Sequence, residues 1–430
     1  MQTVLLKGGR LIDPANNIDR ENSDIWVMEG TIATPPDTAP DDAVIVDVTG
    51  KWITPGLIDM HVHLREPGQE YKETIATGAR AAAAGGFTGV ACMPNTSPVN
   101  DCASVTRFIR EQAARSDARV YPVGSISTAG QGRKLAEFGE MKAAGAVALS
   151  DDGLPVLDSQ LMRRALEYSA SHSMLVISHS EESSLSRNGC MNEGAVATRL
   201  GLKGIPAAAE SIMVYREIAL AELTGVPVHI AHVSTAESVA LIRSAKERGV
   251  RVTAETAPHY FTLTDEAVTG YNSNAKMNPP LRSTRDRHVI RKALADSTLD
   301  AIATDHAPHS ILEKEVEFST AANGIIGLET ALPLSLALVR ENIITPAGLV
   351  ERLSSRPAAI LGVPGGSLAQ GAAADITVID PDRIFTYTEA SIVSASKNSP
   401  FIDWRLQGKA VLTLLGGRIT YDDRTTKHNT

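Results

Sequence analysis

The sequence has few cysteines, no long apolar run and no excess of positive charge. Its three cysteines, Cys92, Cys102 and Cys190, form no CxxC pair, which argues against a disulfide framework and against a thiolate zinc site. No apolar run approaches the length of about 18 residues that crosses a membrane. The formal net charge of −9 argues against nucleic-acid binding, which usually needs a basic face.

The start of the chain, MQTVLLKGGRLID, lacks the basic segment and long apolar stretch of a secretion signal. Together with the sparse cysteines, this start predicts a cytoplasmic protein. The hydrophobic fraction of 43% and the charged fraction of 21% are those of an ordinary globular chain. A chain of 430 residues is long enough for one large core with a smaller appended unit.

Eight short apolar runs alternate with longer segments that favour helix. Residues 70–86, 159–172 and 236–249 are examples of these segments, rich in Ala, Leu, Arg and Glu with apolar spacing near 3.6. An open, doubly wound sheet also alternates strands and helices, but eight strands that are apolar on both faces favour a TIM-like (β/α)8 barrel of the α/β class. The predicted strands are residues 57–63, 87–93, 119–125, 146–150, 174–178, 226–232, 250–255 and 299–305.

Both ends of the chain differ from the middle. They consist of short strand-like pieces separated by Gly, Asp and Pro, and LLKGGRLID near the start resembles LLGGRITYD near the end. We therefore predict a small flanking β domain formed by both termini, residues 1–53 and 367–430. The barrel domain would then comprise residues 54–366.

The first predicted strand ends in LIDMHVHLREPG. In a strand, residues i, i+2 and i+4 share one face, so His61, His63 and Arg65 are predicted to project together. His229, three residues before His232, points to the opposite face of its strand, and we interpret it as a packed or supporting residue.

Other polar residues also follow the ends of predicted strands. In a barrel of this type the carboxyl ends of the strands meet on one face, where active sites are built. One histidine at a strand end is usually structural, DDG is usually a turn, and a lone aspartate can cap a helix. Their coincidence on one rim predicts a metal site, because imidazoles and carboxylates are the usual ligands of catalytic zinc. The candidates are His61, His63, Asp151 or Asp152, His179, His232 and Asp305.

Several motifs resemble those of the dihydroorotases in the amidohydrolase superfamily, most closely the type I branch. They are PGLIDMHVHLREPG, ACMPNTSP, SDDG, HVST, KMNPPLR, ATDHAPH and GIIGLETALPL. HxH is generic to the superfamily, whereas HLREPG, MPNT and NPPLR are more specific. The resemblance implies a barrel flanked by a small β domain. It also implies the reversible cyclisation of N-carbamoyl-L-aspartate to L-dihydroorotate, a step of pyrimidine synthesis.

The resemblance also implies a set of metal ligands for one or two zinc ions. His61 and His63 would hold the more buried zinc with Asp305, and His179 and His232 would hold a second. Many superfamily members bridge the ions with a carboxylated lysine, but type I enzymes use an aspartate. This chain fits the aspartate branch, because the nearest preceding lysine, Lys142, lies well before the strand end. By its match to the second Asp of the family's DDG, Asp152 would be that ligand, with Asp151 as the alternative.

Roles toward the substrate follow from the same resemblance. Asp305 would be the catalytic base that moves the proton, which suits an aspartate beside both ion and substrate. Arg65 offers a planar fork of donors for the substrate carboxylate, although a surface ion pair with Glu66 is the simpler alternative. The remaining predicted substrate-binding residues are His63, Asn95, Asn278, His309, Asn323 and Gly324. The last two lie in AANGI, where the family commonly has PFGI.

Three other functions compete with this one. Allantoinases and dihydropyrimidinases, which are also cyclic amidases, differ after HxH and keep a lysine near the fourth strand. A non-catalytic barrel that serves as a structural partner of aspartate transcarbamoylase would have lost metal ligands. A nucleobase deaminase would need a base-stacking pocket, which the sequence does not suggest. We predict a small-molecule enzyme that forms a homo-oligomer, with aspartate transcarbamoylase as a possible partner and with no nucleic-acid or membrane partner.

Overall fold

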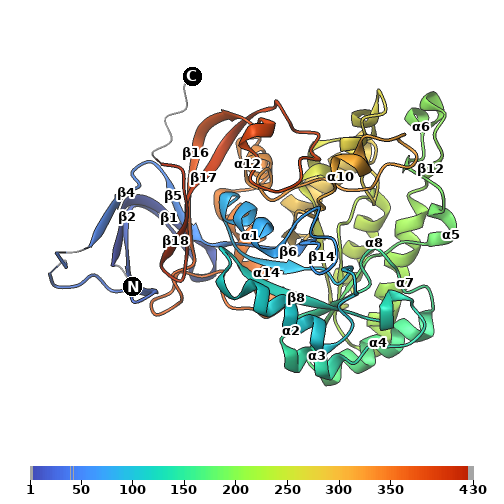
Figure 1. Ribbon diagram of the computed structural model, residues 1–430, viewed down its shortest axis with the longest axis horizontal. Helices are drawn as coiled ribbons and strands as arrows, with labels where there is room; N and C mark the ends of the chain where they lie inside the picture. The colour runs from blue at the N-terminus through green and yellow to red at the C-terminus, as the bar shows by residue number, and fades with distance from the viewer. Residues whose placement is uncertain (1–2, 39, 42, 425–430) are drawn as a thin grey trace.

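Two large sheets organise the chain in the computed structural model, which describes residues 3–38, 40–41 and 43–424. One sheet forms a barrel surrounded by helices, and the other stands beside it as an open sheet (Figure 1). No helix among the described residues is long and apolar enough to cross a membrane.

The barrel sheet consists of eight parallel strands in the order β15-β14-β13-β10-β9-β8-β7-β6. Each strand falls within or across one of the eight predicted runs, so the predicted (β/α)8 barrel is confirmed. Small and apolar side chains, including Met60, Ala148 and Ala301, fill the interior, and Leu361 packs against them. The strands are β6 Leu57–Val62, β7 Phe87–Cys92, β8 Arg119–Ser125, β9 Ala148–Ser150, β10 Leu175–Ser178, β13 Val228–Ile230, β14 Val252–Thr256 and β15 Ala301–Ile302.

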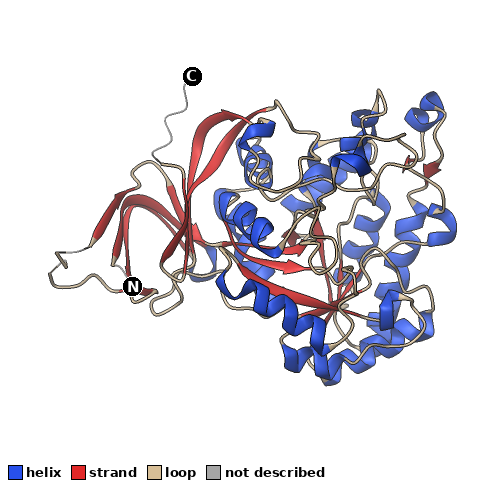
Figure 2. Cartoon of the chain, viewed as in Figure 1, coloured by secondary structure: helices blue, strands red, loops and turns tan. Residues whose placement is uncertain are grey.

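Helices cover the outside of the barrel (Figure 2). The long ones are α1 Ile75–Ala84, α2 Ala103–Gln112, α3 Phe138–Ala144, α4 Ser159–Ser171, α7 Ala208–Thr224, α8 Ala236–Glu247, α10 Thr284–Ala295 and α12 Ala331–Arg340. Shorter ones are α5 Ser183–Ser186, α6 Ala195–Leu200, α9 Pro258–Thr262, α11 Ile311–Lys314, α13 Pro346–Val350 and α14 Arg356–Leu361. A two-stranded sheet joins β11 Met191–Asn192 to β12 Gly204–Ile205.

The helix predicted over residues 70–86 is shorter in the structure. It begins at Ile75 because Thr74 and Thr77 form a reciprocal cap, in which each side chain accepts a hydrogen bond from the other residue's main-chain N–H. The Glu66 carboxylate accepts a further bond from Ile75 N at 2.8 Å. Residues 70–74 therefore belong to a loop at the carboxyl end of β6.

The second sheet combines both ends of the chain. Its order is β18-β17-β16-β5-β1-β2-β3, and β4 also pairs with β1. The two similar segments lie in this one sheet without pairing directly, because the antiparallel pair of β5 and β16 joins the two halves. The division into two domains at residues 53/54 and 366/367 stays a prediction. The strands are β1 Val4–Asp13, β2 Ile18–Met28, β3 Thr31–Ala33, β4 Val44–Asp47, β5 Trp52–Pro55, β16 Ile376–Thr386, β17 Arg405–Leu415 and β18 Arg418–Asp422.

The barrel closes between its first and last strands through a few isolated contacts. In the described chain β6 and β15 share no ladder, and a single parallel bridge joins Val62 to His306. His63 N donates to His306 O at 2.8 Å. The buried carboxylate of Asp59 accepts from Thr304 N at 3.1 Å and from His61 N at 3.1 Å. We refer to this join as the β6–β15 seam.

Candidate metal centre and substrate cavity

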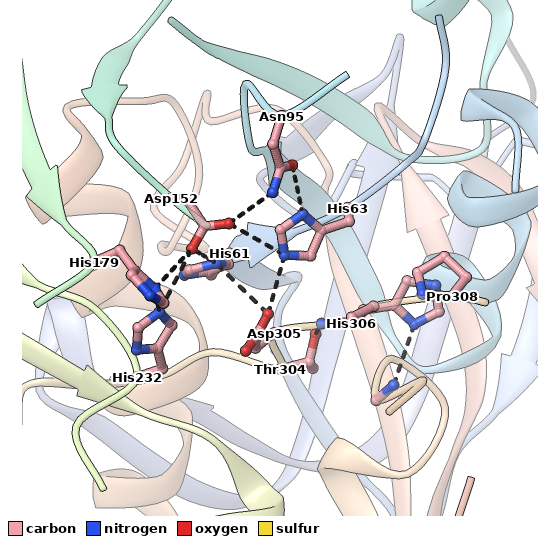
Figure 3. A network of polar contacts seen from close by, with 12 residues as sticks. His61, His63, Asn95, Asp152, His179, His232, Thr304, Asp305, His306 and Pro308 are labelled. Carbon is pink, nitrogen blue, oxygen red and sulfur yellow. Dashed lines mark hydrogen bonds and ion pairs between the residues drawn. The ribbon is translucent and has the colours of Figure 1, made fainter. Parts of the chain in front are cut away.

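Six of the predicted site residues meet at the carboxyl end of the barrel, from five different strand ends (Figure 3). His61 lies in β6, and the others follow β6, β9, β10, β13 and β15. The potential ligand atoms form two groups, and the atoms within each group all lie within 4.8 Å of one another. Both groups include His61. One group adds Asp152 and His232, and the other adds His63 and Asp305. The structure thus brings together predicted site residues that are distant along the chain.

His61 is held through one ring nitrogen while the other faces carboxylates. Nδ1 lies 2.9 Å from Glu255 Oε1. Nε2 lies 3.2 Å from Asp152 Oδ1 and 3.6 Å from Asp305 Oδ1, yet it has no hydrogen-bond partner among the described residues. A buried nitrogen without a hydrogen bond beside two carboxylates is unfavourable by itself. The residues therefore fit a cation placed between them.

Asp152 occupies the centre of the cluster. Its Oδ1 lies 3.6 Å from His179 Nδ1 and 3.5 Å from His232 Nε2, and its Oδ2 lies 3.5 Å from His63 Nε2. Asp151 instead accepts hydrogen bonds from the main-chain N–H groups of Val156 and His179, at 2.7 and 2.9 Å. The carboxylate of Asp151 therefore holds the main chain of the loop, while the carboxylate of Asp152 faces the histidines.

Charge within the cluster also favours a cation. Burial raises the pKa of a carboxyl group, but His61 and the other imidazoles outweigh it and hold the pKa of Asp152 well below its ordinary value. Burial lowers the pKa of His61, but Asp152 and Asp305 outweigh it and raise that pKa well above its ordinary value. The pKa of His179 rises to about 10, because Asp152 and Glu181 outweigh its burial. Two carboxylates thus draw positive charge into a buried site.

His63 and Asn95 are linked at the edge of the cluster. His63 Nδ1 lies 2.9 Å from Asn95 Oδ1 and donates to it, so His63 Nε2 faces Asp305 Oδ1 at 3.1 Å. The amide nitrogen of Asn95 donates to Asp152 Oδ2 at 3.0 Å. Asn95 therefore orients two candidate ligands, in addition to any contact with a substrate.

A cavity of about 300 Å³ opens beside this cluster. Arg65 and His309 stand together at one side, where Arg65 Nη2 donates to His309 Nε2 at 3.2 Å. Burial and the charge of Arg65 lower the pKa of His309 to about 3, so its ring is neutral and Arg65 supplies the positive charge. The lining residues are His63, Arg65, Asn95, Asp152, Gly153, His179, Met277, Asn278, Asp305, Ala307, His309 and Asn323.

Arg65 reaches the cavity by another route than the strand register predicts. β6 ends at Val62, and Arg65 lies in the following loop with φ of 63°. Its Nε donates to Pro308 O at 3.1 Å, which fixes the side chain. The alternative of a surface pair with Glu66 does not occur, because the side chain of Arg65 is buried and Glu66 instead accepts from Ile75 N.

Gly324 lies behind the cavity rather than on its wall. Its N–H donates to Lys276 O at 2.9 Å, and its carbonyl accepts from Lys314 Nζ and Asn398 Nδ2 at 3.1 and 3.0 Å. A Cβ on Gly324 would lie 2.5 Å from Ala307 O, so glycine is needed for this close approach. Asn323, next to it, does line the cavity, and a substrate contact by either residue stays a prediction.

Glu255 is the site residue that sequence reasoning missed. It lies on β14, is 1% exposed and contacts His61. A signal for it existed, because Glu255 is the last residue of the seventh predicted strand, the same position that identified the other candidates.

Backbone conformations in the left-handed region occur at three of the site residues. They are Arg65 with φ of 63°, His232 with φ of 36° and Asp305 with φ of 49°. Such conformations are uncommon for residues with a Cβ and tend to gather at functional sites.

Comparison with known proteins adds a family to this geometry. A family model described as dihydro-orotase-like matches residues 50–238. A dihydroorotase from Desulfotalea psychrophila is 65% identical over 418 residues, which cover 97% of this chain and 99% of that protein. The chain belongs to the dihydroorotase family. A second dihydroorotase, from Syntrophus aciditrophicus, is 54% identical and covers 98% of this chain and 99% of that protein.

Solved structures of other cyclic amidases share the fold of this dihydroorotase family member. The L-hydantoinase of Arthrobacter aurescens superposes with a TM-score of 0.88 at 24% identity, covering 98% of this chain and 97% of that one. A dihydropyrimidinase from Brevibacillus agri gives a TM-score of 0.85 at 23% identity, with coverage of 98% and 95%. The TM-scores show a common fold, a barrel with a flanking β domain.

Proposed function

We propose that this chain is a zinc-dependent dihydroorotase, which interconverts N-carbamoyl-L-aspartate and L-dihydroorotate plus water. The observation that supports it most is the meeting of four histidines and two aspartates beside a cavity that carries Arg65 and His309. The relatives named dihydroorotase, at 54–65% identity over nearly the full chain, support the same reaction.

We assign the proposed ligands from the shared geometry. His61, His63 and Asp305 would hold one zinc ion, and His179 and His232 a second, with Asp152 between them. Asp152 Oδ1 faces His61, His179 and His232, and its Oδ2 faces His63, so this one carboxylate lies against both proposed ligand groups. Zinc, when bound, acts as a Lewis acid that makes water nucleophilic near neutral pH and polarises the substrate carbonyl.

Asp305 is the proposed proton carrier. Nearby imidazoles outweigh the effect of its burial and hold its pKa below the ordinary value, so it is ionised and able to accept a proton. In the hydrolytic direction it would take a proton from the attacking water and return it to the ring nitrogen when the C–N bond breaks. In the direction of ring closure the same carboxylate would move the proton the other way.

Arg65, His309 and Asn95 form the proposed receptor for the substrate carboxylate. Arg65 offers a charged planar fork. Its Nε donates to Pro308 O and its Nη2 to His309 Nε2, which leaves Nη1 and the second hydrogen of Nη2 for the substrate. Asn278 and Asn323 line the same cavity and are proposed to contact the ring. This cationic side of the cavity would favour a ring that carries a carboxylate.

Two structural features disfavour the competing functions. No lysine lies among the cavity-lining residues, and Lys142 donates instead to the main chain at His172 and Ser173. This arrangement argues against a lysine-bridged allantoinase or dihydropyrimidinase. A non-catalytic barrel would lack some of the four histidines and two aspartates that meet here.

A complex with aspartate transcarbamoylase and assembly into a homo-oligomer stay predictions.

Zinc content and activity test this proposal together. Purified protein is expected to contain between one and two zinc ions per chain by elemental analysis and to hydrolyse L-dihydroorotate. Prolonged dialysis against a chelator should abolish the activity, and added zinc should restore it, because the reaction needs the ion. Full activity of protein shown to be metal-free would contradict the proposal.

A further inference from the structure

A line of polar contacts runs from His61 into the wall of the barrel. His61 Nδ1 lies 2.9 Å from Glu255 Oε1, and the other oxygen of Glu255 lies 3.4 Å from His229 Nε2. His229 Nδ1 lies 2.8 Å from Thr253 Oγ1. His229 and Thr253 are direct partners in the pairing of β13 with β14, so two adjacent strands carry the line.

The chemistry of these groups fixes where the protons lie. A carboxylate only accepts, so Nδ1 of His61 carries the hydrogen of its 2.9 Å contact with Glu255. Nε2 of His229 faces the other oxygen of Glu255 at 3.4 Å without a hydrogen bond among the described residues. Nδ1 of His229 pairs with the hydroxyl of Thr253. A histidine that binds a cation is neutral, and hydrogen on Nδ1 of His61 would then leave its lone pair on Nε2, the nitrogen that faces Asp152 and Asp305.

We propose that Glu255, supported by His229, is a positioning residue of the metal centre, which holds His61 in the tautomer and orientation that bind a cation through Nε2. Carboxylates that accept from the second nitrogen of a ligating histidine raise its basicity and fix its ring. His61, Glu255 and His229 are each at most 1% exposed, so water does not compete for these contacts. This inference rests on the proposed zinc site.

The geometry explains why a charged residue occupies this depth. A buried carboxylate is costly unless it is paired and hydrogen-bonded. Glu255 meets that requirement by accepting from His61 and facing His229, and burial on β14 leaves it little freedom to turn. The two oxygens of Glu255 therefore link the proposed ligand His61 to His229, a residue that does not line the cavity.

Glu255→Gln tests the proposal directly. The amide keeps the size of the side chain but loses the negative charge and replaces one accepting oxygen with an NH₂ donor, so its hold on the Nδ1–H of His61 weakens. We expect the affinity for zinc, measured by competition with a chromogenic chelator, to fall about 10- to 100-fold. The visible spectrum of the cobalt(II)-loaded protein should also change, because the ring is no longer held. Both readouts are independent of turnover.

Glu217→Gln is the matched control. Glu217 is a buried glutamate on α7 that interacts with Ser178 and Arg216 rather than with the cluster. Its variant should bind zinc with the affinity of the wild type and give an unchanged cobalt spectrum. An equal loss in both variants would mean that any buried change weakens the site and would overturn the inference.

His229 provides a second test that does not depend on the folding of the first variant. His229→Leu removes the imidazole that faces Glu255 and should lower zinc affinity by a smaller factor, because the contact of Glu255 with His61 remains. His229→Gln places an amide N–H near the same oxygen and should recover part of the loss. Wild-type zinc affinity in the leucine variant, or in Glu255→Gln, would overturn the positioning role. Failure of the wild type itself to bind zinc would instead refute the proposed function.

Discussion

Asp305→Asn is expected to lower the kcat for L-dihydroorotate by several powers of ten. An amide cannot accept the proton of the attacking water, and removal of a general base typically costs 10²- to 10⁴-fold. Asp305 also faces His61 and His63 at 3.6 and 3.1 Å, so its loss weakens the proposed metal site as well. The measurement is kcat at saturating dihydroorotate and excess zinc, with the zinc content determined on the same sample.

Asp375→Asn is a suitable control for this variant. Asp375 is a buried aspartate outside the site, paired with Arg119 through both oxygens at 2.9 and 3.0 Å. Its substitution should reduce stability and leave kcat unchanged. If Asp305→Asn with full zinc occupancy kept more than about a tenth of the wild-type kcat, another group would be the base, because such a loss amounts to less than about 1.4 kcal/mol.

Arg65→Lys is expected to discriminate between two rings. Lysine keeps the charge but loses the planar fork, so the contact with the substrate carboxylate should weaken by roughly 1–3 kcal/mol. The kcat/KM for dihydroorotate should therefore fall by about one to two powers of ten. The kcat/KM for dihydrouracil, the same ring without the carboxylate, should change little. The wild-type enzyme should have a much higher kcat/KM for dihydroorotate than for dihydrouracil.

Arg163→Lys is the matched control, because Arg163 lies on the surface of α4 and pairs with Glu167 far from the cavity lining. It should leave the kinetics of both rings unchanged. An equal loss of kcat/KM for both substrates in Arg65→Lys, or equal wild-type activity on both, would show that Arg65 does not recognise the carboxylate. The chain would then act as a general cyclic amidase.

The sequence predicted the barrel because its strands are apolar on both faces and regularly spaced. That pattern also located the strand ends, and with them His61, His179 and His232, without any knowledge of the fold in three dimensions. The start of α1 was wrong by five residues, because the reciprocal cap of Thr74 and Thr77 outweighs the helical composition of the segment before it.

Details beyond the strand ends required coordinates. The adjacent Asp151 and Asp152 are alike in sequence, and the loop after β9 decides which carboxylate accepts main-chain bonds and which faces the cluster. The strand register does not extend to Arg65, whose direction is set by a left-handed turn. Glu255 was not predicted because its role depends on its contact with His61, which the sequence does not show.

The β6–β15 seam has a thermodynamic consequence. A join held by one bridge and a few hydrogen bonds opens with a smaller free energy than a continuous ladder, so local unfolding should begin there. The proposed ligands His61 and His63 lie on one side of the seam and Asp305 on the other. A cation bound to all three stabilises the closed form by about 4 kcal/mol when free metal is a thousandfold above the dissociation constant. Loading of the ion and closure of the barrel then become one linked equilibrium, and amide hydrogens along the seam would exchange faster in chelated protein than in zinc-loaded protein.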